Sequence, residues 1–254
     1  MRIFFIEGPD NTGKTTVVNE LFNWLCTNQC NNINIMHCEK PEGDTIEEQI
    51  SFQNEAYEKL ARQLVEWNET HEYDAVIFDR CWYGEYVYGT MYRKRDKQEV
   101  IDRIHEYENI LLSSFKPFDL HLILLTTEYP EFLVKNDDGK SISNANIDLI
   151  KKELKLFDEI FNESLIGKDP IETASGNRDM PLELKVNRKV RVIVTRDTWV
   201  EVEAGDDITN LKSYDVKFED GVVYKKTQTG EFKSKSMIFS EIYEKLMLRM
   251  RLFS

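Results

Sequence analysis

The sequence predicts an α/β fold in which a parallel sheet is covered by helices on both faces. Short apolar segments alternate with longer amphipathic segments over residues 1–165, and this alternation is typical of a parallel sheet with crossover helices. A glycine-bearing motif at residues 8–15 separates the first apolar segment from the first amphipathic one. The length of 254 residues, 41% of them hydrophobic, suits one domain with room for an insertion.

The first third of the chain contains strands and helices in strict alternation. Ile3–Ile6 is a short apolar strand, and Thr16–Cys30 has the spacing of an amphipathic helix. A strand is expected at Ile33–His37. Apolar residues then recur at helical spacing over Ile46–Trp67 and predict a long helix. Asp74–Asp79 has the composition of a buried strand and ends in an acid.

The pattern continues to about residue 165. Val100–Phe115 is expected to be a helix, Leu120–Thr126 is an apolar strand, and Ile147–Leu165 is a strongly amphipathic helix. Together with the preceding segments, they complete the core that the alternation predicts.

The character of the sequence changes after Gly167. Lys189–Thr195 is a strand candidate, and Tyr214–Tyr224 reads as a β-hairpin that turns at Asp220-Gly221. A last amphipathic helix carries apolar residues on one face, among them Ile238 and Ile242. We therefore expect a single domain over residues 1–254, with a β-rich insertion at 168–234 and a C-terminal helix at 235–254.

The net charge of −13 is unevenly distributed. Residues 168–254 contain 16 Lys and Arg against 15 Asp and Glu, so the remaining 17 basic and 31 acidic residues give residues 1–167 a charge of −14. Such an acidic body disfavours indiscriminate binding to nucleic acid. No apolar run approaches the length of a membrane span, and four irregularly spaced cysteines do not form a disulfide framework. We expect a cytoplasmic protein without membrane association.

The segment from Gly8 to Thr15 fits the phosphate-loop (Walker A) pattern G-x-x-x-x-G-K-[ST]. Glycines let backbone N–H groups surround phosphate oxygens, and the N-terminus of the following helix adds partial positive charge. Lys14 would reach the β- and γ-phosphates of ATP, and the Thr15 hydroxyl would ligate Mg²⁺. The predicted ATP-binding residues are Gly8, Asn11, Thr12, Gly13, Lys14, Thr15 and Thr16.

A second set of polar residues follows the strand that ends at Asp79. Asp79 and Arg80 stand at the carboxyl end of this strand, which is the edge where open α/β sheets bind ligands. Asp79 would complete the Mg²⁺ site, and Arg80 would offset charge on a transferred phosphoryl group. Trp82 or Tyr83 could line a pocket for a base. The predicted catalytic residues are Asp10, Lys14, Asp79 and Arg80.

These motifs resemble the thymidylate kinase branch of the P-loop nucleotide kinases. The resemblance rests on the segment from Phe5 to Thr16, on Asp79-Arg80 followed by Tyr88, and on the position of Phe52. It covers residues 1–165 and the last helix, and Gly84–Gly89 with Tyr92-Arg93 is similar to virus-encoded members. It implies the nucleotide-kinase fold, with Asp10 at the acceptor nucleoside and Phe52 stacked on the acceptor base. The predicted substrate-binding residues are Asp10, Phe52, Arg80, Trp82, Tyr88 and Arg93.

The chain also departs from this family. The family's acceptor-phosphate arginine is replaced by Ala56, for which Lys59 or Arg62 could substitute, and its Tyr-Gln pair is Tyr88-Gly89. The family's Arg-Glu-Pro appears as Glu39-Lys40-Pro41. The lid is expected at residues 131–143, where Lys135 and Lys140 are the only cations, and Arg93-Lys94-Arg95 is a second basic cluster.

The leading functional hypothesis is an ATP-dependent kinase that phosphorylates a pyrimidine deoxynucleotide. One alternative is phosphorylation of a hydroxyl on a nucleoside, or on a hydroxymethylated pyrimidine such as 5-hydroxymethyluridine in DNA, which the missing arginine at Ala56 and the insertion favour. A regulatory NTP-binding module is an alternative of another class, although the chain has no Asn-Lys-x-Asp motif for guanine. We also expect a homodimer. The insertion at 168–234 is expected to decide acceptor choice and to be dispensable for ATP binding.

Overall fold

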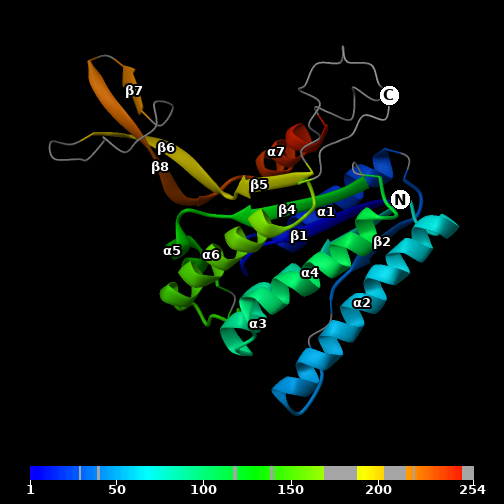
Figure 1. Ribbon diagram of the computed structural model, residues 1–254. Coiled ribbons are helices and arrows are strands. Elements are labelled where there is room, and N and C mark those ends of the chain that lie inside the picture. The colour runs from blue at the N-terminus through cyan, green and yellow to red at the C-terminus, as the bar shows by residue number, and fades with distance from the viewer. Residues whose placement is uncertain are drawn as a thin grey trace.

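The computed structural model describes residues 1–28, 30–38, 41–116, 119–137, 139, 141–168, 188–202, 216–219 and 221–247. Its centre is a five-stranded sheet in the order β2-β3-β1-β4-β5, in which every neighbouring pair is parallel (Figure 1). The strands are β1 (Arg2–Glu7), β2 (Ile33–Met36), β3 (Ala75–Asp79), β4 (Leu120–Thr126) and β5 (Lys189–Ile193). The parallel α/β fold that the sequence predicts is confirmed.

Helices cover both faces of this sheet, because its central strands are apolar on both sides. In β1, Ile3 and Phe5 pack on one face, and Phe4 and Ile6 pack on the other. The first face is covered by α2 (Ile46–Thr70), α3 (Tyr83–Tyr92), α4 (Lys97–Leu112) and α6 (Ile147–Glu163). The second face is covered by α1 (Lys14–Thr27), α5 (Pro130–Lys135) and α7 (Lys235–Met247). No helix in the described ranges is both long and apolar enough to span a bilayer.

Local sequence signals fix where several of these helices begin. Thr45 caps α2 and exchanges hydrogen bonds with Glu48, which forms a capping box. Asp96 and Asn146 accept hydrogen bonds from the first turns of α4 and α6 in the same way. Each cap satisfies N–H groups that have no partner inside the helix, so these boundaries follow from single residues.

Two features of the core differ from the sequence-based expectation. The segment Lys189–Ile193 is β5, which pairs with β4 in the main sheet and therefore belongs to the core rather than to the insertion expected at 168–234. The helix α3 was not expected, because its two glycines and four tyrosines are poor helix formers. Its side chains from Tyr83 to Gly89 are nevertheless buried, and tertiary packing overrides their propensity.

The insertion itself is a β-ribbon between β5 and α7. It consists of β6 (Thr195–Glu201), β7 (Val216–Glu219) and β8 (Val222–Phe232), paired antiparallel in the order β6-β8-β7. The hairpin expected at 214–224 is present between β7 and β8, although residues 214, 215 and 220 lie outside the described part of the chain. Figure 1 shows this ribbon projecting from the body beside α5 and α7.

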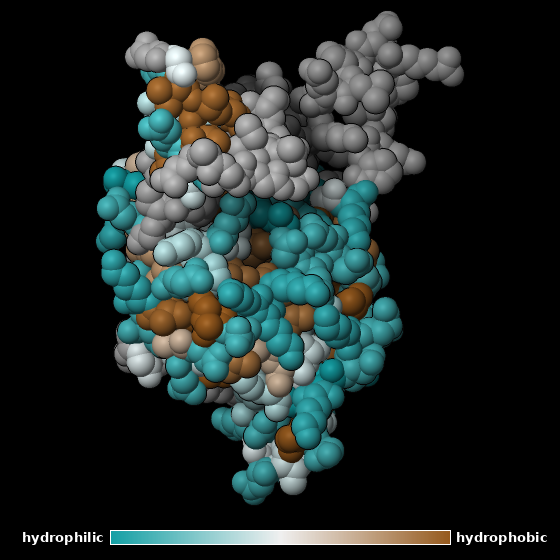
Figure 2. Space-filling model, turned by 90° about the vertical axis from the view of Figure 1, so that its left-hand side faces the viewer, coloured by the Kyte–Doolittle hydropathy of each residue, from teal (hydrophilic) through white to brown (hydrophobic). Residues whose placement is uncertain are grey.

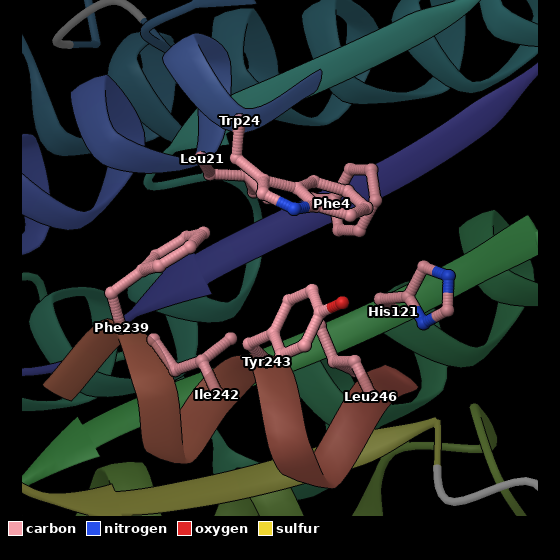
Figure 3. A pocket seen from close by; sticks show the side chains of 8 residues that line it. All are labelled: Phe4, Leu21, Trp24, His121, Phe239, Ile242, Tyr243 and Leu246. Carbon is pink, nitrogen blue, oxygen red and sulfur yellow. The ribbon is translucent and has the colours of Figure 1, made fainter. Parts of the chain in front are cut away.

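The last helix is anchored to the core by an apolar seam (Figure 3). Phe239, Ile242, Tyr243 and Leu246 of α7 face α1, β1 and β4 across this seam. The Trp24 ring meets Tyr243 edge-on at a centroid distance of 5.6 Å. The free space between these side chains is about 10 Å³, which is less than the volume of a ligand. The seam is therefore a packing contact that holds α7 in place.

Candidate active site

The phosphate loop joins β1 to α1 and depends on two glycines. Gly8 has a φ of 145°, and a Cβ placed there would lie 2.3 Å from the backbone oxygen of Leu125. Gly13 precedes α1 with a left-handed φ of 83°. The buried Thr12 hydroxyl donates to the carbonyl of Pro9 at 2.9 Å. These features hold the loop in a tight curve at the N-terminus of α1, where backbone N–H groups can surround a phosphate.

Lys14 begins α1 and turns back over the loop. Its Nζ donates to the carbonyl of Pro9 at 2.7 Å and lies 3.9 Å from the carboxylate of Asp10. Burial lowers the pKa of Lys14 to about 7, and Arg80 adds to this effect while nearby carboxylates oppose it. A bound phosphate would favour the charged ammonium again. The protonation state of Lys14 near neutral pH therefore depends on whether a phosphate is bound.

Thr15 and Asp79 meet at the end of the sheet. The Thr15 hydroxyl donates to Asp79 Oδ2 at 2.6 Å, and Asp79 is only 5% exposed. His37, which follows β2, places Nδ1 at 3.8 Å from the same carboxylate oxygen. A hydroxyl beside a carboxylate is the oxygen-donor pair that Mg²⁺ prefers. Thr15 and Asp79 therefore fit the ion that the sequence predicts.

Arg80 lies beside the loop in a left-handed backbone conformation, with a φ of 70°. Its guanidinium forms an ion pair with Asp10 and lies 4.8 Å from the centroid of the Tyr88 ring. The Tyr88 hydroxyl is buried close to Arg80 but makes no hydrogen bond of normal geometry. Asp10, Arg80 and Tyr88, three of the predicted site residues, thus form one cluster next to the phosphate loop.

Two pockets open beside this loop. The first has a volume of about 420 Å³, and its walls include Lys14, Thr15, Asp79 and Arg80. The second has a volume of about 560 Å³ and lies between α1, the end of the ribbon and the start of α7; its walls include Asn11, Thr16, Asn136, Phe232, Lys233 and Phe239. Both volumes are in the range of small-molecule sites. In Figure 2, which views the side of the molecule where α5 lies, hydrophilic side chains cover most of the body.

The second pocket brings the end of the ribbon next to the phosphate loop, while the dispensability of residues 168–234 for ATP binding stays a prediction. Phe232, the last residue of β8, lines this pocket and packs edge-on against Phe132 of α5 at 4.2 Å between ring centroids. Lys233 also lines the pocket and forms an ion pair with Glu241 of α7. The end of the ribbon is therefore part of the wall beside the phosphate loop.

The expected lid region contacts the loop through an acid rather than a cation. The Asp137 carboxylate accepts hydrogen bonds from the Asn11 amide at 3.3 Å and from the Ser141 hydroxyl at 2.8 Å. Lys135 is the last residue of α5, and Lys140 lies outside the described residues, as do Glu39 and Lys40. The described part of the lid thus places a carboxylate next to the phosphate loop.

The basic cluster after α3 is neutralised by a buried acid. Arg93 and Arg95 both pair with Glu85, which is 4% exposed, and Arg95 also bonds Asn54 and Glu99. A Cβ at Gly89 would lie 2.3 Å from a carboxylate oxygen of Glu85. The glycine at this position therefore makes room for the Glu85–Arg95 pair.

The residues predicted for the acceptor base have two different outcomes. Trp82 and Tyr83 lie in the core, and the role of Phe52 stays a prediction. Trp82 is fully buried and contacts Phe5, Tyr57, Tyr83 and Tyr107, so it belongs to the core and does not line a base pocket. The same correction applies to Tyr83, which is 1% exposed. Phe52 is half-buried on α2, and its role at the acceptor base stays a prediction. Ala56 and its neighbours Lys59 and Arg62 are exposed on α2.

The structure also reveals two buried acids close to Lys14 to which the sequence assigns no role. Glu7 ends β1 and accepts a hydrogen bond from the Cys81 N–H at 2.7 Å, and burial raises its pKa to about 7. Glu153 of α6 is 1% exposed and accepts a hydrogen bond from the Tyr92 hydroxyl at 3.4 Å. A signal for Glu153 was present, since it stands between Ile150 and Phe157 on the apolar face of its helix.

Comparison with solved structures finds chains of similar architecture. One is the YorR protein from Bacillus subtilis, solved in complex with phosphorylated GDP; it is 19% identical, with a TM-score of 0.44 over 65% of this chain and 81% of that one. Another is thymidylate kinase from Ehrlichia chaffeensis, which is 12% identical, with a TM-score of 0.45 over 82% and 90% of the two chains. No family model and no curated protein matches the sequence.

Proposed function

We propose that this chain is an ATP-dependent kinase of the nucleotide-kinase type, which transfers the γ-phosphoryl group to a pyrimidine acceptor, either a deoxynucleotide or, as the second candidate, a hydroxyl group of a nucleoside that is free or within DNA. The observation that carries the proposal is the meeting of Thr15 and Asp79 at 2.6 Å, with Lys14 and Arg80 on the same pocket. A phosphate loop alone binds a nucleotide, whereas an arginine beside the metal-binding pair equips the site for phosphoryl transfer. The acceptor class rests on the resemblance of the sequence motifs.

The donor nucleotide would bind along the N-terminus of α1. Backbone N–H groups of the loop and the Lys14 ammonium would hold its phosphates, and Thr15 with Asp79 would hold Mg²⁺. The ion, when bound, supplies charge neutralisation at the β- and γ-phosphates. The pocket of about 560 Å³ lies beside the loop and offers Phe232 and Phe239 to an adenine ring.

The acceptor would approach the opposite side of the loop, where Arg80 and Asp10 lie. Arg80 would stabilise charge that develops on the transferred group, and its ion pair with Asp10 fixes the position of the guanidinium. Catalysis in such a site consists mainly of positioning and charge stabilisation. Phe52 and Tyr88 are the aromatic side chains proposed for the acceptor base. A DNA-borne acceptor and a homodimer also remain proposals.

The proposal is tested with γ-labelled ATP and a panel of nucleosides, monophosphates and modified DNA. Lys14→Ala should lower turnover by about 10³-fold or more, because the ammonium acts on the transferring group. Lys152→Ala is the matched control, since Lys152 is an exposed lysine on α6 that lines neither pocket beside the loop. Phosphoryl transfer at a near-normal rate by Lys14→Ala would contradict the assignment. Melting temperatures of both variants show whether either change affects folding.

A further inference from the structure

The acceptor side of the site holds arginines that are already paired with acids. Arg80 pairs with Asp10, Arg93 pairs with Glu85, and the buried Arg95 pairs with Glu85 and Glu99. Glu153 adds another carboxyl group, whose electrostatic neighbours are Asp10, Arg80 and Lys14. This side therefore offers the guanidinium groups of Arg80, Arg93 and Arg95 against the carboxyl groups of Asp10, Glu85, Glu99 and Glu153.

Such an arrangement disfavours an acceptor that brings its own dianionic phosphate. The guanidinium groups of Arg80 and Arg93 already have carboxylate partners, so an incoming phosphate would compete with Asp10 and Glu85 for them, and repulsion between like charges in a partly buried site is costly. The described residues on this side thus fit an uncharged acceptor group better than a phosphate.

Glu153 is connected to the phosphate loop by a continuous series of contacts. It accepts a hydrogen bond from Tyr92, Tyr92 stacks on Tyr88 at a centroid distance of 6.3 Å, and Tyr88 lies against Arg80. Tyr92 is 37% exposed and has Asp10 among its electrostatic neighbours, whereas Glu153 is buried, so Tyr92 is the member of the pair that is open to a molecule bound beside Asp10. Burial raises the pKa of Glu153 to about 7, and the Asp10 carboxylate adds to the rise. Glu153 is therefore ready to exchange a proton near neutral pH.

We infer that the acceptor oxygen is a hydroxyl group of a pyrimidine nucleoside, free or within DNA, and that Glu153 takes its proton through the Tyr92 hydroxyl. The inference rests on the proposed kinase function. The acceptor oxygen forms a bond to the γ-phosphorus while the bond from that phosphorus to the bridging oxygen of ADP breaks. The acceptor proton passes to the Tyr92 oxygen, and the Tyr92 proton passes to Glu153. A phosphate acceptor would need no such base, because its oxygen is already deprotonated.

The first measurement uses the full-length protein with γ-labelled ATP. The acceptors are thymidine, 5-hydroxymethyldeoxyuridine, an oligonucleotide that contains 5-hydroxymethyluracil, dTMP and dCMP. We expect label on a hydroxyl of a nucleoside or of the oligonucleotide and none on the two monophosphates. For the labelled acceptor, kcat should rise about tenfold per pH unit below pH 7 and level off above it, since Glu153 must lose its proton to serve as a base.

The second measurement assigns this pH dependence to the two side chains. Glu153→Gln and Tyr92→Phe should each lower kcat by about 10²-fold or more and remove the rise below pH 7. The double variant should be no worse than the poorer single variant within about threefold, because both residues serve one step. Glu153→Asp should keep the pH dependence. The Kd for ATP should stay within about threefold in every variant, since Glu153 and Tyr92 line neither pocket beside the loop.

Glu159→Gln is the matched control. Glu159 lies on the same helix and also accepts a hydrogen bond from a tyrosine, Tyr86, at 2.9 Å, but it pairs with Lys97 rather than facing the site. Its kcat and pH profile should equal those of the wild type. Label on monophosphates alone, or a Glu153→Gln variant with unchanged kcat and pH profile, would overturn the inference and leave the kinase function standing. ATP binding without label on any acceptor would overturn both, and the wild-type pH profile tests the inference even if a variant fails to fold.

Discussion

A substitution at Gly89 tests how tightly the buried ion pair between Glu85 of α3 and Arg95 is packed. Gly89→Ala adds one methyl group, which would lie 2.3 Å from Oε1 and 2.9 Å from Cδ of Glu85, and 3.2 Å from Cδ of Arg95. In an ordinary helix this change stabilises by about 1 kcal/mol, because alanine is the better helix former. Here the Glu85 carboxylate must move, and at 4% exposure it has no route to water.

The expected magnitude follows from the two opposing effects. Breaking a buried ion pair costs about 3–5 kcal/mol. After subtraction of the gain in helix propensity, Gly89→Ala should lower the free energy of unfolding by about 2–4 kcal/mol. For a protein of this size, that corresponds to a fall in Tm of roughly 4–16 °C.

The assay is urea unfolding followed by tryptophan fluorescence, with Trp82 as a probe inside the core. The matched control is Gly84→Ala on the same helix, where the nearest atom to an added Cβ is 3.7 Å away. That variant should gain about 0.5–1 kcal/mol from helix propensity. If Gly89→Ala is as stable as the wild type, or gains stability as Gly84→Ala should, the added methyl group does not break the Glu85–Arg95 ion pair. That result would refute the prediction.

Three further predictions concern the nucleotide site and the ribbon. Since the pKa of Lys14 is about 7 in the free protein, ATP binding at pH 8 should take up close to one proton; calorimetry in two buffers of different ionisation enthalpy measures this uptake, and Lys14→Met should abolish it. Uptake that is unchanged in Lys14→Met would show that another group titrates. Arg80→Ala should lower kcat far more than it lowers Tm, and a large loss of stability with kcat preserved would make the Arg80–Asp10 pair structural. If DNA carries the acceptor, activity on a polynucleotide should fall steeply between low and physiological salt, and charge reversal at Lys225 and Lys226 should flatten that slope; an identical slope in the variant would exclude these lysines from the contact.

Local signals predicted the parts of this fold that depend on neighbouring residues. The phosphate loop was predicted from a local motif, because Gly8, Gly13 and Lys14 lie within the short pattern G-x-x-x-x-G-K-[ST]. The long helix α2 was predicted because its apolar residues recur at helical spacing, and the strand β4 because it is a short, nearly continuous apolar run. Thr15 and Asp79 were placed together because carboxyl ends of parallel strands meet at one edge of the sheet.

The features that sequence reasoning missed depend on distant partners. Lys189 and Arg191 give β5 a charged character, and only its pairing with β4 makes it a core strand. Trp82 looks like a ligand-binding aromatic until the rings of Tyr57 and Tyr107 are seen to enclose it. Glu153 gains significance only from Tyr92 and Asp10, which lie on other elements. Such groupings are properties of the packed molecule, and no periodicity encodes them.

The ribbon leaves and re-enters the body at a single point. The Lys233 N–H donates to the carbonyl of Val194 at 2.8 Å, and Thr195 stands opposite Phe232 as the first pair of the ribbon. A tight turn could therefore replace residues 196–231 without separating β5 from α7. In evolutionary terms, the projecting arm can therefore be lost, lengthened or replaced while the body keeps its fold. Thr195, Phe232 and Lys233, at the junction, contact both parts and must satisfy both at once.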